Sequence, residues 1–222
     1  LNEDYFLRHR VKEITWHTEW LTDSDPESEI GLVDVRRRKT GDGIEAVLYT
    51  PRERRAFAHA TAVLDELGMT IVDARIVSLD DDHSIVTLVF MEQDPRVESD
   101  EARINKVRRA LTRILTAPTD KVLDVTRSVP RQARMFTTTT TVEFGQVPSG
   151  RQTVLELQAA DRPGLLGTIG QVFIEQGIVI EAAKIVTIGE KAEDVFYICR
   201  ESGGALDAQQ QEALGAALLE RL

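Results

Sequence analysis

One segment of the sequence has the residue types of a small-molecule site. It runs Asp161-Arg162-Pro163-Gly164-Leu165-Leu166, between a half-buried strand and an apolar helical face. Gly164 has no side chain, so backbone N–H groups at this turn can approach a ligand closely, and N–H groups at a helix N-terminus suit a carboxylate. Asp161 could face an ammonium group, which with the amides is what a free amino acid requires. A plain structural turn, with Asp161 as helix N-cap and Pro163 and Gly164 shaping the bend, fits the same residues.

No catalytic constellation accompanies this segment. The sequence contains no Gly-x-Ser-x-Gly, no Gly-x-x-x-x-Gly-Lys-Ser/Thr and no His-Glu-x-x-His. We expect surface or partly buried histidines at His9, His17, His59 and His83, rather than metal ligands. The single Cys199 rules out an internal disulfide and is expected to be a buried structural thiol. The sequence therefore favours binding over catalysis, with no metal or cofactor in this chain.

Composition restricts the possible partners. The 222 residues suffice for one large domain or two of about 110. A formal net charge of −10 argues against nucleic acid, because phosphate binding needs a basic face. The longest apolar run, Ile85–Met91, is far shorter than the roughly 20 residues of a membrane-spanning helix. With one cysteine and no basic, apolar leader, we expect a cytoplasmic protein that contacts no membrane.

An internal repeat organises the chain. Gly177–Ile180 resembles Gly68–Ile71, an offset of 109 residues. The same offset aligns three further apolar segments without a gap, including Val86–Val89 with Val195–Ile198. We interpret the chain as two copies of one domain.

Both copies are predicted to have the element order ββαββα. Expected strands in the first copy are Leu32–Arg38, Ile44–Thr50, Met69–Leu79 and Ser84–Met91, with helices near Arg54–Leu67 and Ser99–Leu115. Expected strands in the second are Phe136–Phe144, one through Thr153–Leu157, Ile178–Ile188 and Glu193–Arg200, with helices opening at Asp161 and over Asp207–Leu222. This order predicts an α+β fold of two ferredoxin-like units, each a four-stranded antiparallel sheet with two helices on one face.

Local irregularities and boundaries complete this prediction. Apolar parity changes after Ile71 and Ile180, which a β-bulge would explain, a twisted edge strand being the alternative. We expect a linker helix from a missing upstream domain at 1–27, a first unit at 28–117, a linker at 118–135 and a second unit at 136–222. The helical, aromatic stretch Tyr5–Leu21 is marginal alone and is expected to pack on something outside this chain.

The second copy resembles an ACT domain. The resemblance rests on Asp161–Leu166, on Gly177-Ile178 and on Ala183–Phe196. The run from Lys184 to Phe196 and the opening Asp4–Arg8 are similar to the family of bifunctional uridylyltransferase/uridylyl-removing enzymes of the PII nitrogen-regulatory protein. The resemblance covers the whole chain, as the C-terminal portion of a much longer enzyme.

This resemblance implies a sensor of a free amino acid, with glutamine as the best candidate. The catalytic domains, with UTP and Mg²⁺, would lie in parts of the enzyme that this chain lacks. Ligands of ACT domains sit near the strand-to-helix turn, often where two domains pair through outer strands, within one chain or in a homodimer. That implies ligand contacts from Asp161, Arg162, Gly164, Leu165 and Leu166, with Asp73 and Arg75 of the partner's third strand completing the pocket.

The first copy departs from this pattern, and other functions stay open. Arg52-Glu53-Arg54-Arg55 stands where the second copy has Asp161-Arg162-Pro163-Gly164, so the glycine is absent. One alternative function is a ligand-free scaffold for dimerisation or for contact with PII. Another is a free-standing tandem ACT regulator.

Overall fold

Two units of the same architecture make up the structure, a computed structural model. It describes residues 3–24, 31–38, 43–51, 55–79, 83–94, 96–97, 100–116, 139–148, 150–188 and 191–222. The first unit contains β1 (Leu32–Arg37), β2 (Ile44–Pro51), α3 (Arg55–Glu66), β3 (Met69–Ser78), β4 (His83–Glu92) and α4 (Glu101–Thr116). The second contains β5 (Thr141–Gln146), β6 (Thr153–Ala160), α5 (Leu165–Glu175), β7 (Ile178–Lys184), β8 (Thr187–Ile188), β9 (Lys191–Arg200) and α6 (Ala208–Arg221).

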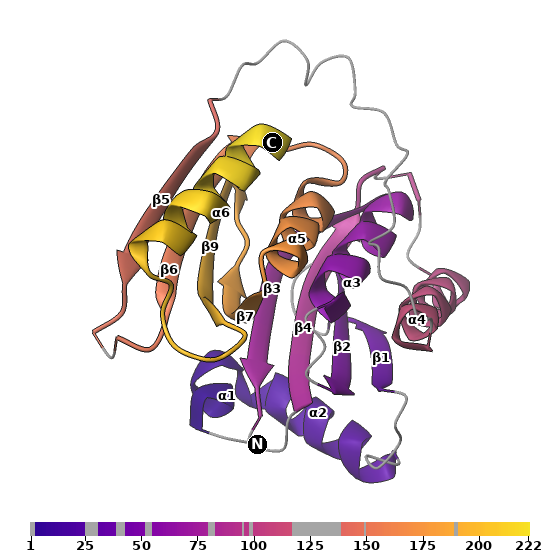
Figure 1. The fold of residues 1–222 in the computed structure, drawn as a ribbon. Coiled ribbons are helices and arrows are strands. Elements are labelled where there is room, and N and C mark those ends of the chain that lie inside the picture. Colours follow the sequence, from indigo (N-terminus) through magenta and orange to yellow (C-terminus); the bar gives the residue numbers. More distant parts are fainter. Residues whose placement is uncertain are drawn as a thin grey trace.

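The sheets confirm the predicted fold class. Their antiparallel strand orders are β1-β2-β4-β3 and β5-β6-β9-β7, with β8 beside β9. Each sheet carries two helices on one face, α3 and α4 or α5 and α6 (Figure 1). The predicted linker at 118–135 lies outside the described residues.

The repeat is visible in the strand registers. β1 and β5, and β2 and β6, begin and end at the offset of 109 residues. The bulge prediction is confirmed, since register shifts fall between Ile71 and Asp73 and, 109 residues later, between Ile180 and Ala182. The fourth strand breaks the offset, because Leu48 pairs with Val86 whereas Leu157 pairs with Asp194.

This shift corrects two predictions about the second unit. The structural equivalent of Val86 is Asp194, 108 residues away, so the predicted alignment of Val86 with Val195 is wrong by one residue. The hairpin that joins the third and fourth strands is one residue shorter in the second unit, which explains the difference. The predicted continuous strand Ile178–Ile188 is also wrong: β7 ends at Lys184, and β8 resumes at Thr187.

The two units pair through their outer strands within one chain. β3 lies beside β7, and α3 packs on α5 (Figure 1). Small residues allow the helices to approach closely, since a Cβ on Gly170 would stand 2.3 Å from the Cβ of Ala58. One apolar core therefore runs through both units, with Phe57 of α3 edge-on to Phe196 of β9.

An N-terminal helix pair covers the other face of the first sheet. α1 (Glu3–Arg8) and α2 (Val11–Asp23) bury Tyr5 and Trp16 against strand residues that include Val47 and Ile85. The expectation that this segment packs outside the chain is therefore wrong, because the helix-free face of the first sheet is apolar and takes it. Among the helices of the described residues, none is both long and apolar enough to cross a membrane.

Candidate functional site

A cavity of about 170 Å³ lies between the two units, beside the Asp161–Gly164 turn. A single water needs roughly 10–15 Å³ of such space, so the cavity has room for a small molecule. The first unit contributes the end of α3 and the start of β3, and the second contributes the turn and the β8–β9 region. The lining residues are Thr61, Asp65, Met69, Thr70, Ile71, Gln93, Asp161, Arg162, Pro163, Leu165, Leu166, Ile185, Thr187, Ala192 and Asp194.

The turn beside the cavity is built around Gly164. β6 ends at Ala160, and Gly164 has φ 82°, a left-handed conformation that favours glycine, immediately before α5 begins at Leu165. The N–H of Leu165 donates to the carbonyl of Arg162 at 3.1 Å. The N-cap residue is Gly164, with no side-chain cap, so the predicted Asp161 cap is wrong. The carboxylate of Asp161 is left to line the cavity.

Asp194 is the most unusual residue of this cavity. It is 1% exposed, yet it sits on the inward-facing side of β9 together with Phe196. Oδ1 accepts a hydrogen bond from the N–H of Val186 at 3.3 Å, whereas Oδ2 has no hydrogen-bond partner in the described part of the chain. Burial, together with the nearby charge of Asp161, raises the pKa of Asp194 to about 7.

The two second-unit carboxylates make the cavity attractive to a cation. Burial also raises the pKa of Asp161 above its ordinary value. A buried carboxylate that lacks a partner is unfavourable in its charged form, and a cationic group placed beside it removes that penalty. The pair can therefore hold an ammonium group.

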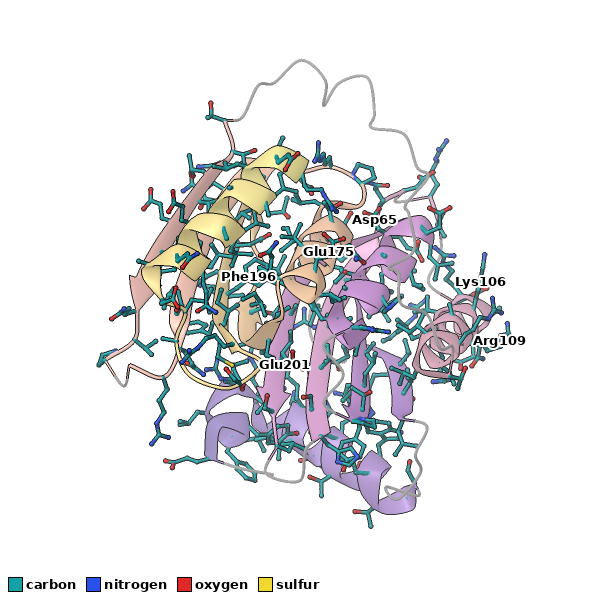
Figure 2. The ribbon with its side chains drawn as sticks, viewed as in Figure 1. Asp65, Lys106, Arg109, Glu175, Phe196 and Glu201 are labelled. Atoms are coloured by element: carbon teal, nitrogen blue, oxygen red, sulfur yellow. The ribbon has the colours of Figure 1, made fainter. Side chains whose placement is uncertain are left out.

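The backbone amide of the turn is already engaged. The N–H of Gly164 donates to Oδ2 of Asp65, which reaches across from α3 of the first unit. Figure 2 shows Asp65 at the end of α3 that adjoins α5. The sequence predicted open amides at this bend, and the structure instead places a protein carboxylate on the first of them.

Other predicted site residues divide into two groups. Arg162, Leu165 and Leu166 line the cavity, and Nη2 of Arg162 donates to the carbonyl of Arg221 at 2.9 Å. Asp73 and Arg75 do not reach it. Arg75 binds both carboxylate oxygens of Glu13, at 2.7 and 2.9 Å, and its Nε lies 3.0 Å from Asp73. The bulge directs this part of β3 toward the N-terminal helices.

A second cavity of about 270 Å³ lies at the equivalent place on the other side of the pairing. Val86 lines it where Asp194 lines the first cavity, so the buried carboxylate has no counterpart. Of the cationic segment predicted to disrupt this site, Arg52–Arg55, residues 52–54 fall outside the described residues, and Arg55, at the place of Gly164, is the first residue of α3.

Three of the four histidines are more deeply buried than predicted, whereas His83 is half-buried, as predicted. His9, His17 and His59 are buried, because the first sheet is covered on both faces. Cys199 is buried as predicted, with Sγ 3.3 Å from Oε1 of Glu181. No cluster of His, Cys, Asp and Glu suited to a metal ion occurs among the residues that the structure describes.

Comparisons with known proteins identify the second unit. Its residues 153–215 match the family model described as ACT domain. The second unit is an ACT domain. The first unit has the same strand order and bulge, and the acidic cavity lies between this ACT domain and its partner unit.

Relatives extend the similarity to the whole chain. The bifunctional uridylyltransferase/uridylyl-removing enzyme of Photobacterium profundum is 37% identical over 99% of this chain, and that of Psychrobacter cryohalolentis is 31% identical over 100% of this chain. The chain spans 24% and 25% of those two proteins. Among solved structures, aspartate kinase from Synechocystis covers 80% of this chain and 26% of its own at 14% identity, with a TM-score of 0.44, too weak to inform function.

Sequence reasoning missed several residues around the ACT domain turn. They are Asp194, Asp65, Thr61, Thr70 and Gln93. Asp194 left a signal, because a charged residue stands among Ala192, Phe196 and Ile198 on the apolar side of a strand. The one-residue shift between the repeats concealed it. Asp65 left none, since its position depends on how the two units pack.

Proposed function

We propose that this chain is an amino-acid-sensing regulatory region of a bifunctional uridylyltransferase/uridylyl-removing enzyme that acts on PII. The proposed ligand is glutamine, bound in the cavity between the ACT domain and the first unit. Support comes from the ACT family match and from relatives that share 31% to 37% identity over the chain. Transfer and removal of uridylyl groups, with UTP and Mg²⁺, are proposed for the rest of the enzyme.

The observation that carries this proposal is the buried, unpartnered carboxylate oxygen of Asp194 in a cavity that also holds Asp161. Burying a charge without a partner is costly, and Val86 occupies the equivalent place in the first unit, so the sheet itself does not need an acid there. An ammonium group between Asp161 and Asp194 would satisfy both. Thr61, Thr70 and Gln93 supply further polar groups for a ligand's other end.

Regulation requires more than binding. A ligand shifts an equilibrium only by the difference between its affinities for two states. Because the proposed site takes residues from both units, any change in how the units pack would alter that affinity. Sensing would therefore act through the packing of α3 on α5.

Calorimetric titration of the folded chain with L-glutamine tests this function. We expect saturable binding, weakened at least roughly tenfold by Asp194→Asn, which removes a charge-assisted contact of about 1.5–3 kcal/mol. The control is Glu156→Gln, which removes the same charge at an exposed position of β6 and should bind normally.

Two outcomes would contradict the proposal. Folded wild-type protein that releases or absorbs no heat with glutamine would leave the scaffold function, which light scattering and PII pull-down would then examine. Equal binding by wild type and Asp194→Asn would place the ligand elsewhere.

A further inference from the structure

The acidic cavity contains a feature that a ligand site does not need, a protein carboxylate on the amide of the turn. Asp65 belongs to the last turn of α3 in the first unit, and Gly164 directly precedes α5 of the second. Their hydrogen bond joins residues that are 99 positions apart in sequence. It is a contact between units, at the wall of the cavity.

The hydrogen bond between Gly164 and Asp65 is the kind of contact that the carboxylate of a ligand would make with this amide. A carboxylate that accepts an N–H at the start of a helix interacts with a local positive potential and forms a charge-assisted hydrogen bond. The carboxylate of an amino acid would seek the same donor. Asp65 and such a ligand cannot both occupy the Gly164 amide.

Comparison of the repeats shows that packing alone does not require the contact. Asp65 lies three residues before Gly68, and Ile174 lies three residues before Gly177. Both glycines have positive φ and follow the equivalent helices α3 and α5. The second helix therefore offers an apolar side chain where the first offers a carboxylate. The acids of the second cavity, Glu181 and Glu201, come from other positions.

The charges that line the cavity also indicate that Asp65 opposes the binding of a ligand's carboxylate. Asp65, Asp161 and Asp194 line one space of about 170 Å³, and Asp194 retains an oxygen without a hydrogen-bond partner in the described chain. Three carboxylates attract a cationic group but repel a ligand's carboxylate. An amino acid can place both of its charged groups here only if Asp65 moves away.

We propose that Asp65 is an internal competitor for the carboxylate of the ligand, and that its displacement from Gly164 couples ligand binding to the packing of the two units. This inference rests on the proposed function for the identity of the ligand. When Asp65 holds Gly164, the end of α3 is tied to the start of α5. Once a ligand takes the amide, that tie is released.

Titrations of Asp65→Ala and Asp65→Asn with L-glutamine test the competition. Both variants should bind glutamine more tightly than wild type, roughly tenfold for Asp65→Ala and less for Asp65→Asn, whose amide oxygen can still accept from Gly164. The matched control is Glu66→Ala, which removes the same charge from the next, exposed residue of α3 and should leave affinity unchanged. Thermal unfolding verifies that each variant is folded. Where wild type binds glutamine, weaker or unchanged binding by the folded Asp65 variants would overturn the inference.

A second measurement makes the inference independent of glutamine. The Gly164 amide resonance is followed by NMR during titration with acetate, which supplies a carboxylate alone. We expect acetate to shift this resonance in Asp65→Ala and not in wild type at the same concentration. Failure of glutamine to bind, with this acetate effect present, would refute the proposed function and retain the competition. No acetate effect in Asp65→Ala would refute the competition, whatever glutamine does.

Discussion

At the scale of single residues, the central feature is Asp194, a carboxylic acid at a buried strand position where the first unit has an apolar side chain. Val86 and Asp194 occupy equivalent places in the two sheets, and both are buried. The acid has one hydrogen bond to the backbone and a pKa raised by burial to about 7. The ionised form of this buried acid therefore costs the folded protein stability at this position.

This shifted pKa predicts how stability depends on pH. Between the ordinary value of 3.8 and about 7, folded Asp194 holds a proton that the unfolded chain has lost. Stability from this group is therefore lost as pH rises through that window, by up to about 1.4 kcal/mol per pH unit. Urea unfolding from pH 4 to 8 should show Asp194→Asn gaining stability relative to wild type up to pH 7, and no further gain above it. Parallel curves would show that Asp194 ionises normally.

At the scale of elements, the pairing of α3 with α5 decides whether the cavity exists. Gly170 and Ala58 meet where any larger residue would separate the helices. Both helices also present residues to the cavity, Thr61 and Asp65 from α3 and Leu165 and Leu166 from α5. Gly170 and Ala58 therefore help to shape the cavity, although they are not among the residues that line it.

Gly170→Ala is expected to destabilise the protein although alanine favours helices. The added Cβ would lie 2.3 Å from the Cβ and 2.8 Å from the Cα of Ala58, so backbone must move, at about 1–3 kcal/mol. The gain in helix propensity is about 1 kcal/mol at most. Thermal unfolding should show a lower midpoint, whereas Gly145→Ala, whose Cβ would meet only Val154 at 3.8 Å, should not. An unchanged midpoint in Gly170→Ala would mean that the helices are packed less closely.

Much of this element-level structure could be predicted from sequence, because it depends on local periodicity. Alternation in β6, the glycines after α3 and α5, and the bulge parity all led to correct elements. The fourth-strand shift could not be predicted at low identity between the repeats, since it depends on the length of one hairpin. The open amide at Gly164 was mispredicted because its acceptor, Asp65, belongs to the other unit.

At the scale of the whole molecule, the two units differ most on their outer faces. β2 and β4 are buried on both sides, since apolar residues occur at both parities, as in Ile85-Val86 and Val89-Phe90. That pattern is typical of a sheet covered on both faces, and α1 and α2 provide the cover. Arg8 of α1 also lies over the Tyr197 ring of β9, so the N-terminal pair contacts both units.

An ion pair holds this cover in place. Burial raises the pKa of Glu13, but hydrogen bonds from Arg75 and the Arg10 backbone outweigh it and bring the pKa to about 2. Arg75→Met should cost about 3 kcal/mol in urea unfolding, because it strands a buried carboxylate. The control is Arg96→Met, whose pair with Asp94 is exposed and screened by solvent, so its loss should cost much less. Equal losses would refute a special role for Arg75. In wild type, the stability that the Glu13–Arg75 pair contributes is lost as pH falls from 4.5 toward 2.

The two units belong to one chain, so their two cavities need not be identical. This affects how binding depends on ligand concentration. In a homodimer of identical units, every residue would occur at both cavities. Two coupled identical sites could then give a steep dependence of binding on ligand concentration. Among the described residues, one cavity holds the buried Asp194 and the equivalent cavity holds Val86 in its place, so the two cavities of one chain are not identical. Binding of the proposed ligand at the Asp194 cavity alone would give a hyperbolic saturation curve, and an enzyme regulated through it would track the abundance of its effector gradually instead of switching at a threshold.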